Sequence, residues 1–353
     1  MSRFLTARMA ALPAYVPGTH AERNDVIRLN SNESPFPPSK EVQEAVIRVL
    51  GGLNYYNDPD CTELLAALAE HSGVKPENVM ASNGSDQALY FAFMAFAGEE
   101  RPILLPDVTY GYYTDFAAAL GVRLIRRPLR EDYTIDPDDY KRKGAMVCFP
   151  NPNAPTGLAL NHDQLREILE ADRERVVLID EAYADFGTES VLPLISEYDN
   201  LLIVRTFSKS GSLAGGRLGY ALGSRQLISE LSAVRSSIDL YGVSRMAQAA
   251  GVAACRSWEY YAANCRKIME ARAYALGELR KMGCEATDSL GNFLFVRPPM
   301  DAALLQKKLA AAGILVRYWD EPRLADRLRI SVGTMEDMKT LCDQIRRILE
   351  EKP

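Results

Sequence analysis

The chain has 353 residues, of which 47% are hydrophobic and 25% are charged. At roughly 150 residues per domain, this length predicts two domains, or one large domain with an appendage. The composition is that of a folded globular protein and excludes a disordered or fibrous one. The 41 basic and 47 acidic side chains give a formal charge of −6, which argues against a nucleic-acid coat protein or a polybasic membrane-binding protein.

The cysteines and histidines are scattered along the chain. The six cysteines form no C-x-x-C pair, and the three histidines lie far from one another in the sequence. We therefore expect neither a metal site nor a disulfide framework, and a cytoplasmic location is the expectation. The most apolar run, residues 89–98, is too short to cross a bilayer, so no membrane anchor is expected.

Short apolar runs alternate with amphipathic helical patterns through the first two thirds of the chain. Helices are expected at 41–50 and 163–171, and strands at 79–82, 103–105, near 122, 145–149, 176–180, 201–204 and 218–223. This alternation predicts an α/β fold with a large, doubly wound and mostly parallel sheet.

The pattern changes after about residue 250. A long helical stretch at 255–282 is followed by expected strands at 291–297, 314–318 and 328–332. A helix is expected to end at Gly313, and Thr334 with Asp337 predicts a capping box for a last helix. We expect an N-terminal arm over 1–30, a large α/β domain over 31–252 and a small α+β domain over 253–353.

A lysine among small and hydroxyl residues follows the strand expected at 201–204. In TFSKSGSLAGGRLGY, residues 206–220, Lys209 lies close to Thr206 and Ser208, and Arg217 follows. An isolated lysine in such a segment more often belongs to a flexible loop. Hydroxyls, backbone amides exposed by glycines and a guanidinium are, as a set, donors that suit a phosphate group.

Asp180 ends the apolar strand expected at 176–180. Its carboxylate is therefore expected at the carboxyl edge of the sheet, where open α/β folds bind ligands. A helix or turn cap explains such an aspartate equally well. A buried carboxylate there needs a positive partner, and a protonated ring nitrogen is one.

Two further strings follow expected strands. CFPNPNAPTG, residues 148–157, contains two X-Pro bonds and predicts a rigid turn. ASNGSDQAL, residues 81–89, runs from a strand into a helix that starts near Ser85. Free amides at that helix start can hold an anion, although a plain N-cap is the commoner explanation.

Together these strings resemble the aspartate-aminotransferase superfamily of pyridoxal-5'-phosphate (PLP) enzymes, fold type I, and within it the histidinol-phosphate aminotransferases. The resemblance extends over nearly the whole chain. It also includes LNSNESPFPPS at 29–39, YYNDPD at 55–60, PDVTYGYY at 106–113, DEAYADF at 180–186 and LRISVGT at 328–334.

The resemblance implies a PLP-dependent aminotransferase with a role for each matched residue. Lys209 is implied to carry the cofactor aldehyde and later to move the substrate proton, and Asp180 to keep the ring nitrogen protonated. Tyr183 is implied to hydrogen-bond the phenolate oxygen, and Tyr110 to stack on the ring. The phosphate is implied to be held by Gly84, Ser85, Asp86, Thr206, Ser208 and Arg217, and by Tyr55 reaching across a homodimer.

One position departs from the family pattern. Many members have an asparagine directly before Pro-Thr-Gly, whereas this chain has Ala154. The preceding Asn153 is one candidate to replace that asparagine, and Tyr183 acting alone is the other. By the same resemblance, Arg317, Arg329 and Tyr15 are expected to bind the substrate, although an ion pair at an interface or on the surface explains Arg317 equally well.

The implied reaction transfers the amino group of histidinol phosphate to 2-oxoglutarate, in histidine biosynthesis. One alternative keeps the fold and the cofactor and acts on aromatic amino acids. Another is a decarboxylase similar to the threonine-phosphate decarboxylases, in which Cα loses carbon dioxide. A third is a protein that binds the cofactor or a partner without turnover.

Overall fold

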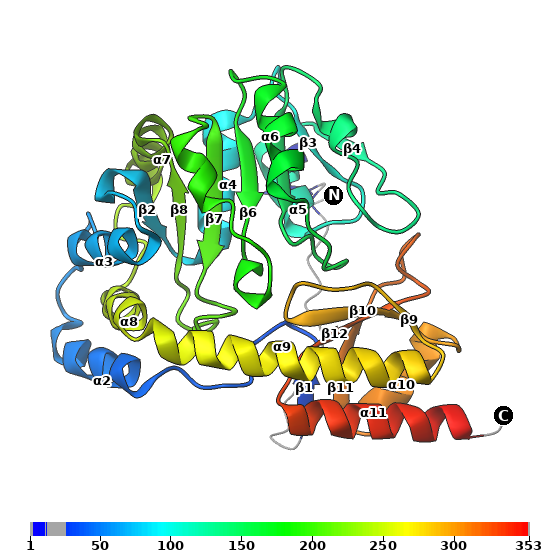
Figure 1. Ribbon diagram of the computed structural model, residues 1–353. Helices are drawn as coiled ribbons and strands as arrows, with labels where there is room; N and C mark the ends of the chain where they lie inside the picture. The colour runs from blue at the N-terminus through cyan, green and yellow to red at the C-terminus, as the bar shows by residue number, and fades with distance from the viewer. Residues whose placement is uncertain (1–2, 11, 13–25, 352–353) are drawn as a thin grey trace.

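The computed structural model describes residues 3–10, 12 and 26–351, which form two sheets (Figure 1). The larger sheet has seven strands in the order β2-β8-β7-β6-β5-β3-β4. They are β2 (Val79–Ser82), β3 (Ile103–Pro106), β4 (Leu124–Arg127), β5 (Met146–Pro150), β6 (Val177–Asp180), β7 (Leu201–Thr206) and β8 (Gly219–Gly223). All neighbours pair in parallel except β8, which is antiparallel to β2 and β7. The expected α/β class and mostly parallel sheet are confirmed.

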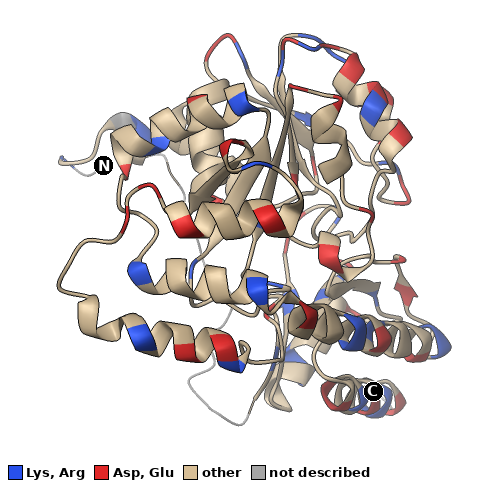
Figure 2. Ribbon diagram, turned by 60° about the vertical axis from the view of Figure 1, so that its left-hand side comes forward, with Lys and Arg blue, Asp and Glu red and all other residues tan. Residues whose placement is uncertain are grey.

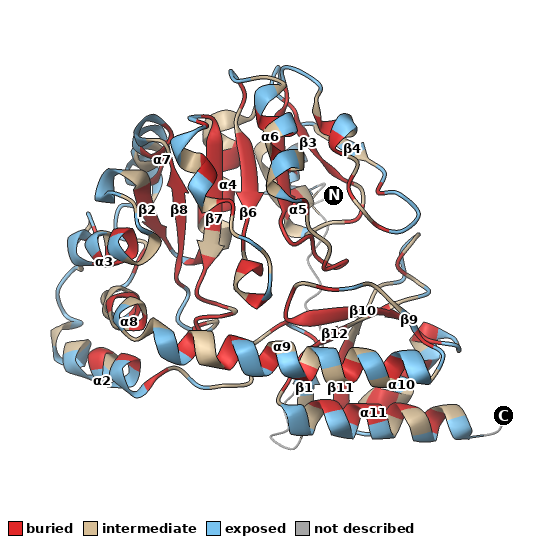
Figure 3. Cartoon of the chain, in the orientation of Figure 1, coloured by how far each residue is buried: buried red, intermediate tan, exposed pale blue. Residues whose placement is uncertain are grey.

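Helices cover both faces of this sheet because its strands are apolar on both sides. Val177 and Ile179 of β6 belong to one core, whereas Leu178 belongs to another, as the two-residue period of a strand requires. The first core includes residues of α2 (Lys40–Val49), α3 (Thr62–Ser72), α6 (His162–Glu170) and α8 (Arg245–Arg256). The second includes residues of α4 (Gly84–Phe96), α5 (Tyr112–Leu120) and α7 (Arg225–Ile238). Figure 3 shows buried strands and helices with exposed outer faces.

The smaller sheet has five strands in the order β1-β11-β12-β10-β9. They are β1 (Ile27–Leu29), β9 (Glu285–Ala286), β10 (Phe293–Arg297), β11 (Ile314–Tyr318) and β12 (Leu328–Ser331). Its core is completed by α9 (Trp258–Lys281), α10 (Ala302–Ala311) and α11 (Met335–Glu350). The capping box predicted for Thr334 and Asp337 starts α11.

The structure refines the expected organisation at two points. Residues 27–29, expected within an arm, pair in parallel with β11 and are an edge strand of the smaller sheet. The expected boundary at 252/253 falls inside α8, which packs against α2 and α3, whereas α9 packs against α11. α9 itself spans both units, since Tyr261 belongs to the first core of the larger sheet and Ile268 to the core of the smaller one.

Shorter helices complete the described chain: α1 (Ala7–Ala10), η1 (Leu50–Gly52), η2 (Pro76–Asn78), η3 (Pro137–Tyr140), η4 (Ala184–Phe186) and η5 (Leu192–Ser196). Basic and acidic residues are mixed along the helices (Figure 2). Among the described residues, no helix combines the length and apolarity that a membrane span requires.

Candidate active site

Five loops at the carboxyl edge of the larger sheet meet in one cavity of about 210 Å³, here called the first cavity. They follow β2, β3, β5, β6 and β7, which lie in one sheet. Because parallel strands end at a common edge, residues far apart in the sequence meet there. Nine of the residues singled out from the sequence line this cavity: Ser85, Asp86, Tyr110, Asp180, Tyr183, Thr206, Ser208, Lys209 and Arg217.

One end of the first cavity gathers hydrogen-bond donors. Arg217 forms an ion pair with Asp86, with 3.3 Å between Nη2 and Oδ2. Gly84 opens α4 at φ +75°, and a Cβ there would lie 2.5 Å from Nη2 of Arg217. The guanidinium therefore lies against the start of the helix. Thr206 and Ser208 line the same cavity, and their hydroxyls are hydrogen-bonded to each other at 3.0 Å. This donor set suits a phosphate.

Asp180 provides a buried carboxylate in the same cavity. Its Oδ2 accepts a hydrogen bond of 2.9 Å from the Tyr113 hydroxyl, and its Oδ1 accepts one of 3.0 Å from the Ala182 backbone amide. Burial raises the pKa of Asp180 to about 6, although both hydrogen bonds act in the opposite direction. A cationic group placed against this carboxylate would therefore be strongly favoured.

Lys209 lies on the wall that the first cavity shares with a second one. Burial, followed by the charge of Arg329, lowers the pKa of its amine to about 8. Its Nζ donates a hydrogen bond of 3.0 Å to the backbone oxygen of Ser31. A lysine in this setting has a much larger neutral, nucleophilic fraction near pH 7 than an ordinary lysine.

The second cavity, of about 270 Å³, contains both arginines expected to bind the substrate. Arg317 of β11 and Arg329 of β12 are direct cross-strand partners. The Trp319 ring lies 5.1 Å from the guanidinium carbon of Arg317 and 5.3 Å from that of Arg329. Nη2 of Arg329 also donates to the backbone oxygen of Asn30 at 2.8 Å. The second cavity therefore presents two positive charges fixed by a shared aromatic ring.

Three described residues that were expected at the site are absent from the linings of both cavities: Gly84, which lies at the start of α4, Tyr55 and Asn153. Tyr55 is 72% exposed on the surface. The amide of Asn153 donates to the backbone oxygen of Val108 at 3.0 Å and accepts from the Thr109 hydroxyl at 3.0 Å. These bonds direct the Asn153 side chain away from the cavities. The next residue, Ala154, lines both of them. Tyr15 lies outside the described residues.

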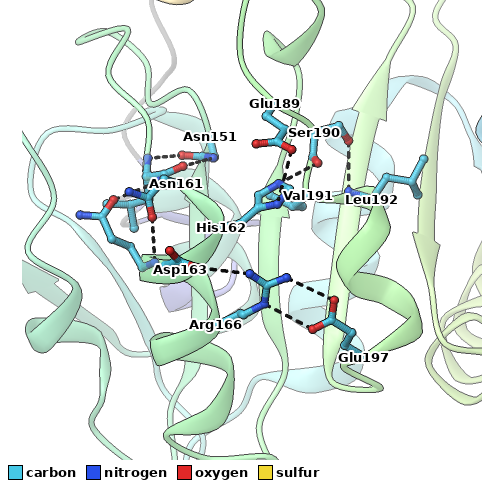
Figure 4. Close-up of polar contacts among 12 residues, drawn as sticks. Asn151, Asn161, His162, Asp163, Arg166, Glu189, Ser190, Val191, Leu192 and Glu197 are labelled. Carbon is cyan, nitrogen blue, oxygen red and sulfur yellow. Dashed lines mark hydrogen bonds and ion pairs between the residues drawn. The ribbon is translucent and has the colours of Figure 1, made fainter.

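A polar cluster holds this turn in place (Figure 4). The Asn151 amide closes the turn with two hydrogen bonds to the backbone of Leu160. Asn161 then starts α6 with a capping box. The first turn of α6 is joined to the 189–197 segment by His162, which contacts the Ser190 carbonyl, and by Arg166, which pairs with Glu197 (Figure 4). These contacts join the turn that carries Ala154 to α6 and to the 189–197 segment.

Sequence reasoning missed three residues of the site. Tyr113 is the second residue of α5, within the string PDVTYGYY, and its hydroxyl donates to Asp180. Asn32 lies within the string LNSNESPFPPS and donates from Nδ2 to the Tyr183 hydroxyl oxygen at 3.1 Å. Trp319 lines the second cavity with its ring beside both arginines, a placement that depends on long-range packing and that no local pattern indicates.

Comparisons with known proteins agree with this geometry. A family model described as Aminotransferase class I and II matches residues 24–345. The chain is 42% identical over 354 residues to histidinol-phosphate aminotransferase 2 of Dechloromonas aromatica (strain RCB), with 99% of each chain covered. It is 41% identical over 351 residues to the histidinol-phosphate aminotransferase of Gluconacetobacter diazotrophicus, again with 99% of each covered.

A solved structure shows the same fold. The histidinol-phosphate aminotransferase from Sinorhizobium meliloti, in complex with pyridoxal-5'-phosphate, superimposes with a TM-score of 0.88 at 26% identity, covering 99% of both chains. The match extends over both sheets and over the loops that form the two cavities, since it includes nearly every residue. This chain belongs to the class I and II aminotransferase family.

Proposed function

We propose that this protein is a PLP-dependent histidinol-phosphate aminotransferase of histidine biosynthesis. It transfers the amino group of L-histidinol phosphate to 2-oxoglutarate and releases imidazole-acetol phosphate and L-glutamate. The observation that carries the proposal is a lysine with a lowered pKa and a buried carboxylate, in one cavity with a phosphate-binding set of donors. Relatives of that name at about 40% identity support the choice of substrate.

The residues of the first cavity fit PLP by their chemistry. Arg217, Ser208, Thr206, Ser85 and the start of α4 at Gly84 provide donors for the phosphate, with Asp86 orienting Arg217. Asp180 provides an anion for the ring nitrogen, and its raised pKa indicates an unmet demand for a positive partner. When bound, the cofactor supplies an electron sink for the charge left at the substrate Cα.

The work of the protein itself is to hold this group and to move one proton. The neutral amine of Lys209 provides the attachment point and, once released, takes the proton from the substrate Cα. Its place on the wall between the two cavities puts it between the cofactor residues and the substrate arginines. Tyr183 lines both cavities and provides a hydroxyl for the phenolate oxygen, and Tyr110 provides a ring face.

Substrate binding belongs to the second cavity. Arg329 and Arg317 present guanidinium groups whose paired donors fit a phosphate or a carboxylate, so one pair serves both histidinol phosphate and glutamate. Tyr15, proposed as a further contact on the basis of the family resemblance, lies outside the described residues.

A homodimer is part of this proposal. Large apolar side chains are exposed around the end of α2 and the neighbouring ends of α7 and α8: Ile47, Leu50, Leu53, Tyr55, Tyr56, Ile238, Leu240, Tyr241 and Met246. Such a surface suits association with a second copy. Tyr55 lies within it, as a residue that reaches the phosphate of a partner's site would. A cytoplasmic location is proposed as well, in keeping with the six free thiols.

The visible absorption of the protein loaded with PLP tests the proposal, with Lys209→Ala as the control. We expect a band that depends on Lys209 and that histidinol phosphate bleaches more effectively than phenylalanine. Preferential bleaching by phenylalanine would support the aromatic aminotransferase. Release of carbon dioxide from the substrate would identify a decarboxylase, and a bound cofactor without turnover would leave a binding protein.

A further inference from the structure

Asn32 is a buried residue whose backbone N–H, backbone oxygen, Oδ1 and Nδ2 each have a hydrogen-bond partner. It is 1% exposed and has φ +54°, a left-handed conformation that asparagine tolerates better than most residues. Its backbone N–H donates to Oγ of Ser331 at 2.7 Å, and its backbone oxygen accepts from Nδ2 of Asn292 at 3.0 Å. Ser331 is the last residue of β12 in the smaller sheet, and Asn292 directly precedes β10 of the same sheet. Asn32 therefore joins the segment after β1 to the smaller unit.

The direction of these bonds fixes the side-chain amide. Because Oγ of Ser331 accepts from the Asn32 backbone, its own proton is donated to Oδ1 of Asn32, at 2.8 Å. The NH₂ group of the amide then faces Tyr183 and donates to the phenolic oxygen at 3.1 Å. Since that oxygen accepts from Asn32, the Tyr183 proton is available to an acceptor in the cavities that this side chain lines.

The residues on either side of Asn32 contact the site as well. The backbone oxygen of Ser31 accepts from Nζ of Lys209, and that of Asn30 accepts from Nη2 of Arg329. One tripeptide thus touches the lysine, the tyrosine and a substrate arginine. In the family pattern, an asparagine at the position of Ala154 also donates to the phenolate oxygen of the cofactor. Alanine has no donor, so Tyr183, which lines the same cavity, is the residue that can make this bond here.

We propose that Asn32 is a positioning residue: held by Ser331, it orients the Tyr183 hydroxyl so that its proton is donated to the phenolate oxygen of the cofactor. This inference rests on the proposed function, since it explains how the Tyr183 hydroxyl of that site is oriented. In a chain that has alanine instead of asparagine at position 154, Asn32 thereby influences the hydrogen bond to the phenolate oxygen.

The pH midpoint of the visible band in the PLP-loaded protein measures this role directly. A donor to an anionic oxygen disfavours protonation of the neighbouring cofactor nitrogen, so loss of its alignment raises the midpoint. We expect Asn32→Ala to raise the midpoint by about 1 unit, the effect of about one hydrogen bond. In a Tyr183→Phe background, the same substitution is expected to shift the midpoint no further, because Asn32 acts through the tyrosine.

Asn200→Ala is the matched control. Asn200 is also buried and directly precedes β7, at the end of the strand away from Lys209. Its amide donates to the backbone oxygens of Leu169, Asp172 and Arg175. It should lower stability without moving the midpoint. Ser331→Ala, which removes only a hydroxyl, provides a second test if Asn32→Ala does not fold, with a smaller shift in the same direction expected.

The outcomes separate this inference from the proposed function. A wild-type protein with no band that depends on Lys209 would overturn the proposed function. A normal wild-type band, moved by Tyr183→Phe but by neither Asn32→Ala nor Ser331→Ala, would overturn only the role of Asn32. Equal shifts from Asn32→Ala in the wild-type and Tyr183→Phe backgrounds would also overturn it.

Discussion

The hydroxyl of Tyr113 donates a 2.9 Å hydrogen bond to Oδ2 of Asp180, and both side chains are buried. Burial alone would raise the pKa of the carboxyl further than the value of about 6, because this bond and the one from Ala182 favour the charged form. Tyr113 therefore keeps Asp180 available as an anion near neutral pH.

Removing this bond should change the pH dependence of the enzyme. Tyr113→Phe is expected to raise the pKa of Asp180 by about 1 unit, since one hydrogen bond contributes about 1 kcal/mol. In the apoprotein, the pH range over which stability falls as Asp180 ionises should move to higher pH by a similar amount, as measured by urea unfolding. Tyr140→Phe is the control, because the Tyr140 hydroxyl is buried without a partner among the described residues. Coincident profiles for wild type and Tyr113→Phe would contradict this role.

The same burial predicts a cost in stability for the protein without its cofactor. Between the ordinary pKa of 3.8 and the folded value of about 6, the folded protein binds more protons at Asp180 than the unfolded chain does. The stabilising contribution is therefore complete below pH 3.8 and is lost as the pH rises through 6. The difference amounts to up to about 3 kcal/mol above pH 7.

Asp180→Asn should remove this penalty, because an amide does not ionise. We expect the variant apoprotein to be more stable than wild type by up to about 3 kcal/mol at pH 8 and nearly equal to it at pH 4, as measured by urea unfolding. A variant that is less stable at both pH values would show that the carboxylate is better accommodated than its burial indicates.

The lowered pKa of Lys209 predicts how quickly the cofactor attaches. An amine with a pKa of about 8 instead of 10.5 has a neutral fraction about 300-fold larger at pH 7. The rate at which the visible band forms after PLP is mixed with the apoprotein should rise with pH and level off above about 8.

The charge of Arg329 contributes to this lowering, so Arg329→Gln should raise the pKa of Lys209 and move the rate profile to higher pH. Arg317→Gln removes a guanidinium from the same cavity and shows whether the effect is specific to Arg329. An Arg329→Gln profile that matches wild type would leave burial and the charge of Arg217 as the causes of the lowered pKa.

A buried ion pair next to Asp180 should contribute strongly to stability when one partner is removed. Nη2 of Arg205 lies 2.7 Å from Oε2 of Glu181, whose side chain is fully buried and also accepts from the Ser190 hydroxyl. Arg205→Ala leaves that carboxylate unpaired, and we expect a loss of about 3–5 kcal/mol in the free energy of unfolding.

The exposed pair between Arg256 and Glu63, at 3.2 Å, provides the comparison. Arg256→Ala should change the free energy of unfolding by less than about 1 kcal/mol, because water screens this pair. Equal losses for the two variants, measured by urea unfolding, would show that the Arg205 pair contributes little beyond a surface contact.

The sequence was most informative where function depends on the end of a strand. Asp180 and Lys209 follow strands whose apolar runs are easy to locate, and the edge of a parallel sheet then brings them together. Asn32 and Ser331 are 299 residues apart, and no local pattern indicates that they meet. The three-residue strand β1 was missed for the same reason, since its pairing with residues 314–316 has no local signal.

The sequence also did not indicate which side chain of the turn at 151–157 faces the cavities. Asn153 was one of two candidates to replace the amide missing at 154, with Tyr183 acting alone as the other. The Asn153 side chain turns toward Val108 and Thr109. Which of two adjacent residues faces a cavity depends on the backbone angles of the turn, and residue types alone do not specify them.

The pairing of β1 with β11 also determines which of the two sheets can form first while the chain is being synthesised. The larger sheet needs only residues up to Gly223, so it can form while the rest of the chain is still being made. β1 leaves the ribosome before the other described strands, yet its partner β11 is made more than 280 residues later. An interrupted chain would therefore display the phosphate-binding donors without the second cavity, and only the finished chain has a place for the substrate.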